Sequence, residues 1–459
     1  MGIRRIDLPL LVVALVIFSM ILLLQPWWLP PGISPYDYHR WVEVALLVLL
    51  ICMAATGGSL KSAAFIPWIV PYLIFCFLVA LACFFAESGI VSWAAGLRAI
   101  MWIAGIIIIV RSFSNIPARK LAWLLIALLV MLAVHVFYSM VGICVLLLNK
   151  VEGKNFIVSS FSNINHAAAF YGVCLFILPG VADIVYRSGL KVRGLLIFVG
   201  AGLAFLMLII GSRGSYMAGI FAIVLTIFVF GKKSFFYIKE YLIYFLSGLA
   251  VFLVFEFFFC RHIYSGAGSG PGVFYDGGRV QLWSIAWKGF LDSPFLGKGP
   301  LSYAMNTSLS VTHPHNLLLS VLYEYGVFVA LLGLLVTLKV SLFLWKERWR
   351  FRDDIPVMAG MAAVISFAVH SQVGGLAMIP LTVMIFSLGL SFCFSPVMSL
   401  VDERWGGVRW RPKTSILLSL LLGLFVFLYL FVVVQYWASL SHQGAAEPRF
   451  WLHGEIHNQ

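Results

Sequence analysis

"ILLSLLLGLFVFLYLFVVVQYW", residues 416–437, is a run of 22 residues without a charged side chain. A helix needs about 20 apolar residues to cross the hydrocarbon core of a bilayer, so this stretch is long enough to span a membrane. "LPLLVVALVIFSMILLL", residues 8–24, has the same character. Because such runs recur along the whole chain, a cleaved signal peptide or a single membrane anchor is excluded.

The composition agrees with many membrane spans. Of the 459 residues, 62% are hydrophobic and only 11% are charged, whereas a soluble domain carries roughly a quarter charged residues. We predict an all-α polytopic integral membrane protein with about 12–13 transmembrane helices. The candidate spans are residues 8–24, 41–56, 64–86, 90–110, 121–148, 166–186, 195–210, 214–230, 241–260, 315–345, 355–371, 376–396 and 414–437.

The connections between these spans alternate in charge, which predicts their sidedness. The basic ones are residues 1–7, 111–120, 186–194, 231–240, 346–354 and 402–413. Lys and Arg accumulate in cytoplasmic loops, so we expect these segments to face the cytoplasm and the others to face outward. The predicted regions are an N-terminal bundle of about nine spans (1–260), a large periplasmic loop (261–314), C-terminal spans (315–437) and a tail (438–459).

The formal charge of +13 has a topological explanation in such a protein, so we expect no binding of nucleic acid. The seven cysteines lie in or at the ends of apolar segments, without metal-ligand spacing or paired loop positions. They are expected to be small buried hydrophobes, and disulfide or redox chemistry is not supported.

The large loop begins with a glycine-rich stretch, "SGAGSGPG" (265–272), and continues with "RVQLWSIAWKGFL" (279–291). In the second stretch, apolar side chains recur at helical spacing, namely Val280, Trp283, Trp287, Phe290 and Leu291. We predict an amphipathic helix that lies on the membrane surface or covers a cavity.

Two arginines on the outward side are candidate anion-binding residues, because ionisable groups at membrane depth are costly. Arg213 lies in a very short turn between two spans, where Gly211 and Gly214 permit a tight bend and exposed N–H groups. The plainer alternative for Arg213 is a side chain that reaches the lipid head groups. Arg279 begins the amphipathic helix, where the helix dipole disfavours a cation but attracts a phosphate that arginine can bind.

Further polar groups lie at or within the spans. Arg98, in "AAGLRAIMW" (94–102), is about two turns inside a span and is either an anion site or half of a structural pair, with Glu256 as one available partner. The segment "SFSNINHAAAF" (160–170) adds Asn163, Asn165 and His166 at the outward mouth of a helix. Helix capping accounts for one asparagine but hardly for all three groups.

The stretch "THPHNLLLSVLYEYG" (312–326) places two histidines before a long apolar run. Thr312 is the expected N-cap and Pro314 suits a first helical turn, which puts His315 at the helix N-terminus. The helix dipole there favours a neutral imidazole that accepts a proton or hydrogen-bonds a substrate. The alternatives are a polar cap, or a metal site with His313, although the outward loops offer few carboxylates to complete one.

At these residues the chain resembles the O-antigen ligase and O-antigen polymerase membrane family. The resemblance consists of His315-Asn316 followed after nine residues by Gly326, an arginine in a short outward turn (Arg213), and another in the large loop before the histidine (Arg279). "FSNINHAA" and "SPFLGKGP" (293–300) are further similar patches. The similarity is strongest over residues 160–345, and the family usually has one span fewer than the thirteen counted here, which leaves the side of the C-terminus open.

The resemblance implies an inverting, metal-independent glycosyltransferase of the bacterial inner membrane without a cofactor, with its active site facing the periplasm. Its donor would be O-antigen polysaccharide on undecaprenyl diphosphate and its acceptor a sugar hydroxyl of lipid A–core, both within membrane lipids. Arg213 and Arg279 would stabilise the diphosphate and His315 would accept the hydroxyl proton. The expected substrate-binding residues are His313, Asn316, Arg98, Asn163, Asn165 and His166.

Two kinds of alternative stay open. An O-antigen polymerase or a protein O-oligosaccharyltransferase would share these motifs and differ in the acceptor. A transporter or flippase could also place arginines and histidines in an outward cavity. Transporters more naturally show polar residues facing both sides and interrupted helices in corresponding halves, whereas the unusual groups here concentrate on one side.

Overall fold

The computed structural model describes residues 66–87, 89–114, 116–148, 164–260, 278–306 and 313–404, with Leu424, Phe427, Leu428 and Phe431. The predicted spans 8–24 and 41–56, the glycine-rich stretch and the tail lie outside these residues, as does nearly all of the span 414–437. The part of the chain that the structure describes contains helices and no strand, which confirms the predicted all-α fold.

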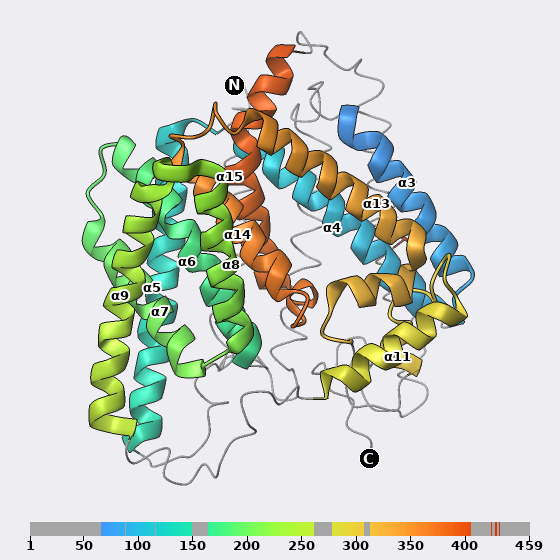
Figure 1. Cartoon of the computed structure of the whole chain (residues 1–459), viewed down its shortest axis with the longest axis horizontal. Coiled ribbons are helices and arrows are strands. Elements are labelled where there is room, and N and C mark those ends of the chain that lie inside the picture. The colour runs from blue at the N-terminus through green and yellow to red at the C-terminus, as the bar shows by residue number, and fades with distance from the viewer. Residues whose placement is uncertain are drawn as a thin grey trace, which may run out of the picture.

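The long helices and the short elements between them follow the hydropathy pattern (Figure 1). In chain order they are α3 (Ile66–Phe84), α4 (Ile90–Ser114), α5 (Ala118–Leu148), α6 (Ile164–Arg187), α7 (Arg193–Ile210), α8 (Arg213–Phe230), η4 (Gly231–Ser234), α9 (Phe235–Phe255), η5 (Glu256–Cys260), α11 (Arg279–Asp292), α12 (Ser302–Asn306), α13 (Leu317–Glu347), α14 (Ile355–His370), η6 (Leu376–Met378) and α15 (Pro380–Arg404). Every predicted span between residues 64 and 396 is matched by a helix, and the predicted amphipathic helix is α11.

Six helical stretches of the described residues are long and apolar enough to cross a membrane. They are α4, α5, α6, α7, α13 and one continuous stretch, Arg213–Phe258, that includes α8 and α9. Three shorter apolar helices, within α3, α14 and α15, accompany them. The chain is therefore a multi-pass membrane protein, as its composition predicts.

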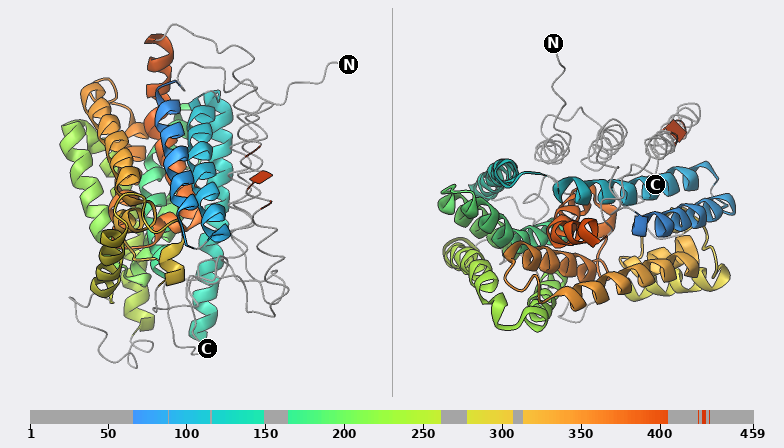
Figure 2. Two further views of the ribbon diagram at one scale, coloured as in Figure 1. Left: turned by 90° about the vertical axis from the view of Figure 1, so that its right-hand side faces the viewer. Right: turned by 90° about the horizontal axis from the view of Figure 1, so that it is seen from above.

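Helix α6 is the centre of the bundle, because its membrane-length stretch is the most completely buried of the six. It packs on α14, and α14 packs on α15, through very small side chains. A Cβ at Gly180 of α6 would lie 2.9 Å from the Cβ of Ala359, and one at Gly360 of α14 would lie 2.8 Å from the backbone N of Cys393. Small residues allow this close approach of backbones, which takes the place of the hydrophobic effect in lipid. Figure 2, seen from above, shows α14 and α15 between the α5–α9 group and α3.

Helix α13, which matches the predicted span 315–345, contains a break in its helical conformation. It begins at Leu317 and its helical conformation is interrupted at Gly326, whose φ of 74° and ψ of −176° are not helical. The predicted span is confirmed, but the sequence did not indicate the break, because a glycine in a long apolar run gives no clue that the backbone turns there. The result is a short segment, 317–325, followed by a long one, 327–347.

The loop 293–300 replaces the backbone hydrogen bonds that this break interrupts. The N–H groups of Lys298 and Gly299 donate to the carbonyls of Tyr323 and Glu324 over 2.8 and 3.0 Å. In return, the Pro294 carbonyl accepts the N–H of Val327 over 2.8 Å. The break is therefore fully stabilised by a separate segment, as a membrane-adjacent helix requires.

Three of the basic connections, residues 186–194, 231–240 and 346–354, are joined by ion pairs at one end of the bundle. Lys233 after α8 forms an ion pair with Asp353 before α14 over 2.7 Å, and Arg193 at the start of α7 pairs with Glu240 on α9 over 3.3 Å. In Figure 1 these connections are at the upper end, and α11 lies toward the lower end. Charge and fold thus agree in giving the bundle one basic end and one end that carries α11.

We expect Gly326→Ala to destabilise the protein, because its backbone is left-handed and an added Cβ would collide with the carbonyl of Phe295. Gly333→Ala, in the same helix, is the control: nothing lies within 4 Å of its Cβ, so the change should be neutral or stabilising by up to about 1 kcal/mol. Thermal unfolding in detergent measures both. Equal midpoints for the two variants would show that the break at Gly326 tolerates a side chain.

Candidate active site

His315 lies in the turn directly before α13 in a left-handed conformation, with φ of 53°. The residue after it, Asn316, is the N-cap: its Oδ1 accepts the N–H of Leu319 over 2.9 Å. The prediction that Thr312 caps this helix was therefore wrong, because an asparagine closer to the first turn takes the position; Thr312 itself lies outside the described residues.

The turn at the end of α14, residues 370–375, holds this helix start in place. The Ser371 carbonyl accepts the N–H of Leu317 over 2.8 Å, and the Gln372 carbonyl accepts Nδ2 of Asn316 over 3.1 Å. Oε1 of Gln372 accepts the N–H of Leu318 over 3.4 Å. Because protein groups satisfy the N–H groups of Leu317, Leu318 and Leu319, this helix end offers none of these three to a phosphate.

The two histidines of the turn contact each other. The ring centroids of His313 and His315 are 4.3 Å apart at 61°. Burial, and then the nearby charge of Arg279, lowers the pKa of His315 to about 4. Burial, and then the neighbouring His315 and His166, lowers the pKa of His313 well below its ordinary value. Both imidazoles are therefore neutral at pH 7.

His370, the last residue of α14, is a member of this group that sequence reasoning missed. It is buried, and its Nδ1 lies 3.5 Å from Oγ of Ser215, just after the Arg213 turn. A Cβ at Gly214 would lie 2.9 Å from Nε2 of His370, so the imidazole packs directly on this backbone. The available signal was a histidine followed by two glycines in "HSQVGG" (370–375), which reads from sequence as an ordinary neutral loop.

The two predicted arginines each occupy the first position of a helix. Arg213 begins α8 after Gly211, which has φ of 70°, and Ser212 at the N-cap makes no side-chain hydrogen bond to the helix. Arg279 begins α11 after Gly278, which has φ of 78°. The contact between Gly214 and His370 places Arg213 beside the histidines, and Arg279 lies within electrostatic reach of His315 and His370. Arg279 is thus the cation whose charge reaches the imidazoles, whereas the exposed Arg213 begins the helix whose first turn packs on His370.

The remaining candidates divide between two places. His166 is buried near the start of α6, within electrostatic reach of His313, His315 and His370, whereas Asn165 beside it is exposed. Asn163 lies outside the described residues.

Arg98 of α4 lies within electrostatic reach of Glu324 and Tyr325, at the break in α13. Its acidic neighbour is therefore Glu324 and not Glu256, a long-range relation that sequence spacing does not reveal.

The described residues contain no group of three or more His, Cys, Asp or Glu side chains arranged to hold a metal ion. The gathered side chains are imidazoles and guanidinium groups, and cations repel a metal ion. What this arrangement offers is the binding of an anion by the arginines next to an imidazole that can accept a proton.

Comparison with known families agrees with the resemblance seen in the sequence. Residues 196–334 match the family model described as O-antigen ligase, so the predicted resemblance is confirmed over that region. The matched region includes Arg213, Arg279, His313, His315 and Gly326, and it excludes Arg98, His166 and His370. A search of curated proteins found no match.

We expect Gly214→Ala to lower the free energy of unfolding by about 1–3 kcal/mol, because the new methyl group would press on the His370 imidazole. His370→Ala in the same chain should recover part of this loss, which a double-mutant cycle on thermal unfolding measures. Gly219→Ala on the same helix is the control, because its nearest neighbour would be 3.6 Å away, an ordinary contact. Strictly additive effects of the two substitutions would contradict the packing of His370 on Gly214.

Proposed function

We propose that this protein is an inverting, metal-independent glycosyltransferase that moves O-antigen polysaccharide from undecaprenyl diphosphate to a sugar hydroxyl of lipid A–core. The observation that supports the proposal is a neutral His315 within electrostatic reach of Arg279, beside His370, on which the Arg213 turn packs. The match of residues 196–334 to the O-antigen ligase family supports a ligase-type membrane enzyme.

The donor's diphosphate is the group that the arginines recognise. As the bond between the anomeric carbon and the diphosphate oxygen breaks, negative charge grows on the leaving group. Arg213 and Arg279 supply cationic N–H groups to that charge, a role that many transferases give to a divalent ion. The planar guanidinium fork suits phosphate oxygens, and both arginines stand at helix starts, where the dipole also favours an anion.

The acceptor hydroxyl needs a base as it attacks the anomeric carbon from the face opposite the diphosphate. His315 takes the hydroxyl proton, the new glycosidic C–O bond forms, and undecaprenyl diphosphate departs with the electron pair of the broken bond. Attack from the opposite face inverts the anomeric configuration. The neutral state of His315 at pH 7 leaves a ring nitrogen able to accept the proton.

Neighbouring residues support these roles. Asn316 fixes His315 through its cap on α13 and its bond to Gln372. His370 connects the Arg213 turn with the turn that docks α13. In this proposal His313, His166 and Asn165 are assigned to binding of the sugars. Arg98 is proposed to act through Glu324 on the helix break.

The site faces the periplasm in this proposal, because the basic connections at the other end belong in the cytoplasm. A polymerase or a protein O-oligosaccharyltransferase would use the same chemistry with another acceptor.

The fate of surface polysaccharide in a deletion strain separates these functions. Full-length polymer should accumulate on the lipid carrier, and purified enzyme should transfer it to lipid A–core in EDTA. Single repeat units capping the core of the deletion strain would instead indicate a polymerase. Loss of transfer in EDTA would show that the reaction requires a metal ion.

His315→Asn should lower turnover about 100- to 10,000-fold while donor binding persists, because general-base assistance contributes this much to rate. Asparagine is chosen because it tolerates the left-handed backbone of this position. Arg279→Ala should weaken donor binding as well as turnover, and Arg279→Lys should restore only part, because lysine lacks the bidentate fork. If His315→Asn loses donor binding with turnover of bound donor unchanged, this histidine contacts the diphosphate and is not the base.

The pH at which activity falls on the acid side should differ between the pH profile of kcat and that of kcat/KM. The limb of kcat/KM reports the free enzyme, in which His315 has its pKa near 4, so the base stays neutral down to about that pH. In the donor complex the diphosphate offsets the charge of Arg279, so the pKa of His315 rises and the limb of kcat moves to higher pH. In Arg279→Gln the two limbs should approach each other. Coincident wild-type limbs near pH 6.5, the ordinary pKa of histidine, would contradict this arrangement.

A further inference from the structure

A second cationic site lies at the opposite end of α13 from His315. Arg348 follows the last residue of the helix, and its guanidinium carbon lies 3.9 Å from the ring centroid of Trp345 and 4.7 Å from that of Trp349. Trp345 also stacks on Phe228 of α8, with centroids 5.5 Å apart. Both indoles stay accessible, with 40% and 63% of their surface exposed. The guanidinium is therefore held on an aromatic platform at the surface.

Arg348 differs from its charged neighbours in having no carboxylate partner among the described residues. Arg350 pairs with Glu347 over 2.9 Å, and Asp353 pairs with both Lys233 and Arg352. Arg348 instead donates from Nη1 to the backbone carbonyl of Trp345. A guanidinium has five N–H donors, so this single bond leaves most of them for another acceptor.

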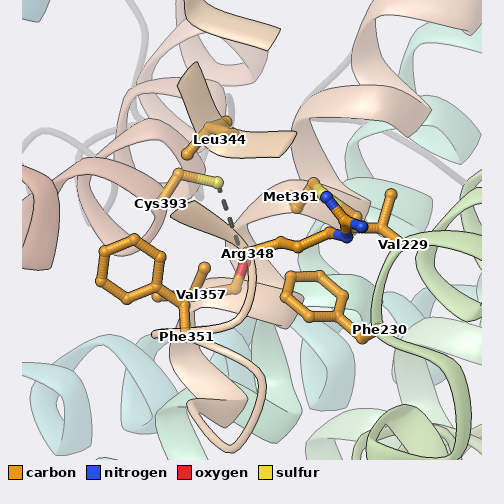
Figure 3. A pocket seen from close by; sticks show the side chains of 8 residues that line it. All are labelled: Val229, Phe230, Leu344, Arg348, Phe351, Val357, Met361 and Cys393. Carbon is orange, nitrogen blue, oxygen red and sulfur yellow. Dashed lines mark hydrogen bonds between the residues drawn. The ribbon is translucent and has the colours of Figure 1, made fainter. Parts of the chain in front are cut away.

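The wall beside Arg348 is apolar. Figure 3 shows its side chain extending between Phe230 and Met361 toward Val229, over a crevice also lined by Leu344, Phe351, Val357 and Cys393. The crevice is narrow, with room for about one water molecule, so neither a sugar nor a lipid chain fits inside. This apolar lining lowers the local dielectric constant and so strengthens the electrostatic attraction of the guanidinium for an anion.

We propose that Arg348, on its Trp345 and Trp349 platform, binds the phosphate of an anionic membrane phospholipid. Arginine binds phosphate oxygens bidentately and stacks on aromatic rings at the same time, which lysine cannot do. The surroundings add attraction, because Lys232 and Lys346 lie on the two adjoining segments and no ion pair to a described carboxylate engages either of them. Exposed tryptophans at this level suit the head-group region, where an indole has one apolar and one wet side.

The test measures lipid retention by the intact protein. Full-length protein is purified from a mixture of phosphatidylglycerol and phosphatidylcholine and examined by native mass spectrometry as wild type, Arg348→Gln and Arg352→Gln. Wild type and the Arg352→Gln control, whose charge is already paired with Asp353, should retain phosphatidylglycerol. Arg348→Gln should lose the preference by about tenfold, equivalent to about 1.4 kcal/mol. Unchanged retention in Arg348→Gln, or equal loss in both variants, would overturn a site centred on Arg348.

A second substitution and a soluble competitor serve as further controls. Arg348→Lys keeps the charge but not the fork, so it should retain an intermediate amount even if the glutamine variant folds poorly. Inorganic phosphate is added to the wild-type protein as a soluble competitor, and it should not release the bound lipid. Release at millimolar phosphate would mean that the site recognises a free anion and not a lipid head group.

Discussion

A helix beside a membrane can be interrupted only where another segment takes over its backbone hydrogen bonds. Loop 293–300 does this for α13 at Gly326, through three backbone bonds of 2.8–3.0 Å. The segment 317–325 is thereby held at both ends, by this loop at the break and by the α14 turn at its start. The position of His315 therefore depends in part on a segment that carries no catalytic group.

The hydropathy pattern predicted the helices well, because each long apolar run must form a helix to satisfy its backbone in lipid. It could not predict the interruption of α13, since residues 317–347 are apolar on both sides of Gly326. The N-cap was misplaced for a local reason: threonine and asparagine both suit the position, and the bond from the Leu319 N–H to Oδ1 of Asn316 identifies the asparagine as the cap.

The candidate site was predictable to the extent that its members are chemically conspicuous. Local sequence identifies Arg213, Arg279 and His315, because each is a polar group near glycine or proline at the end of an apolar run. The neighbours of Arg98 and the part played by His370 depend on contacts between α4 and α13 and between α8 and α14, which are far apart in sequence. No spacing in a single chain reveals such contacts, so these relations required the structure.

The glycines around the imidazoles limit how this protein can diverge. Gly375 packs on His313 so closely that any Cβ would collide with the ring, and Gly374 makes a looser contact with His370, with 3.2 Å between a Cβ and Cδ2. The order in which two such positions change therefore matters. A larger residue at position 375 becomes tolerable only after position 313 has lost its ring. A lineage that changes the glycine first passes through an unstable intermediate. Descendants should accordingly keep these glycine–histidine pairs together or lose both members, and mixed combinations should be rare.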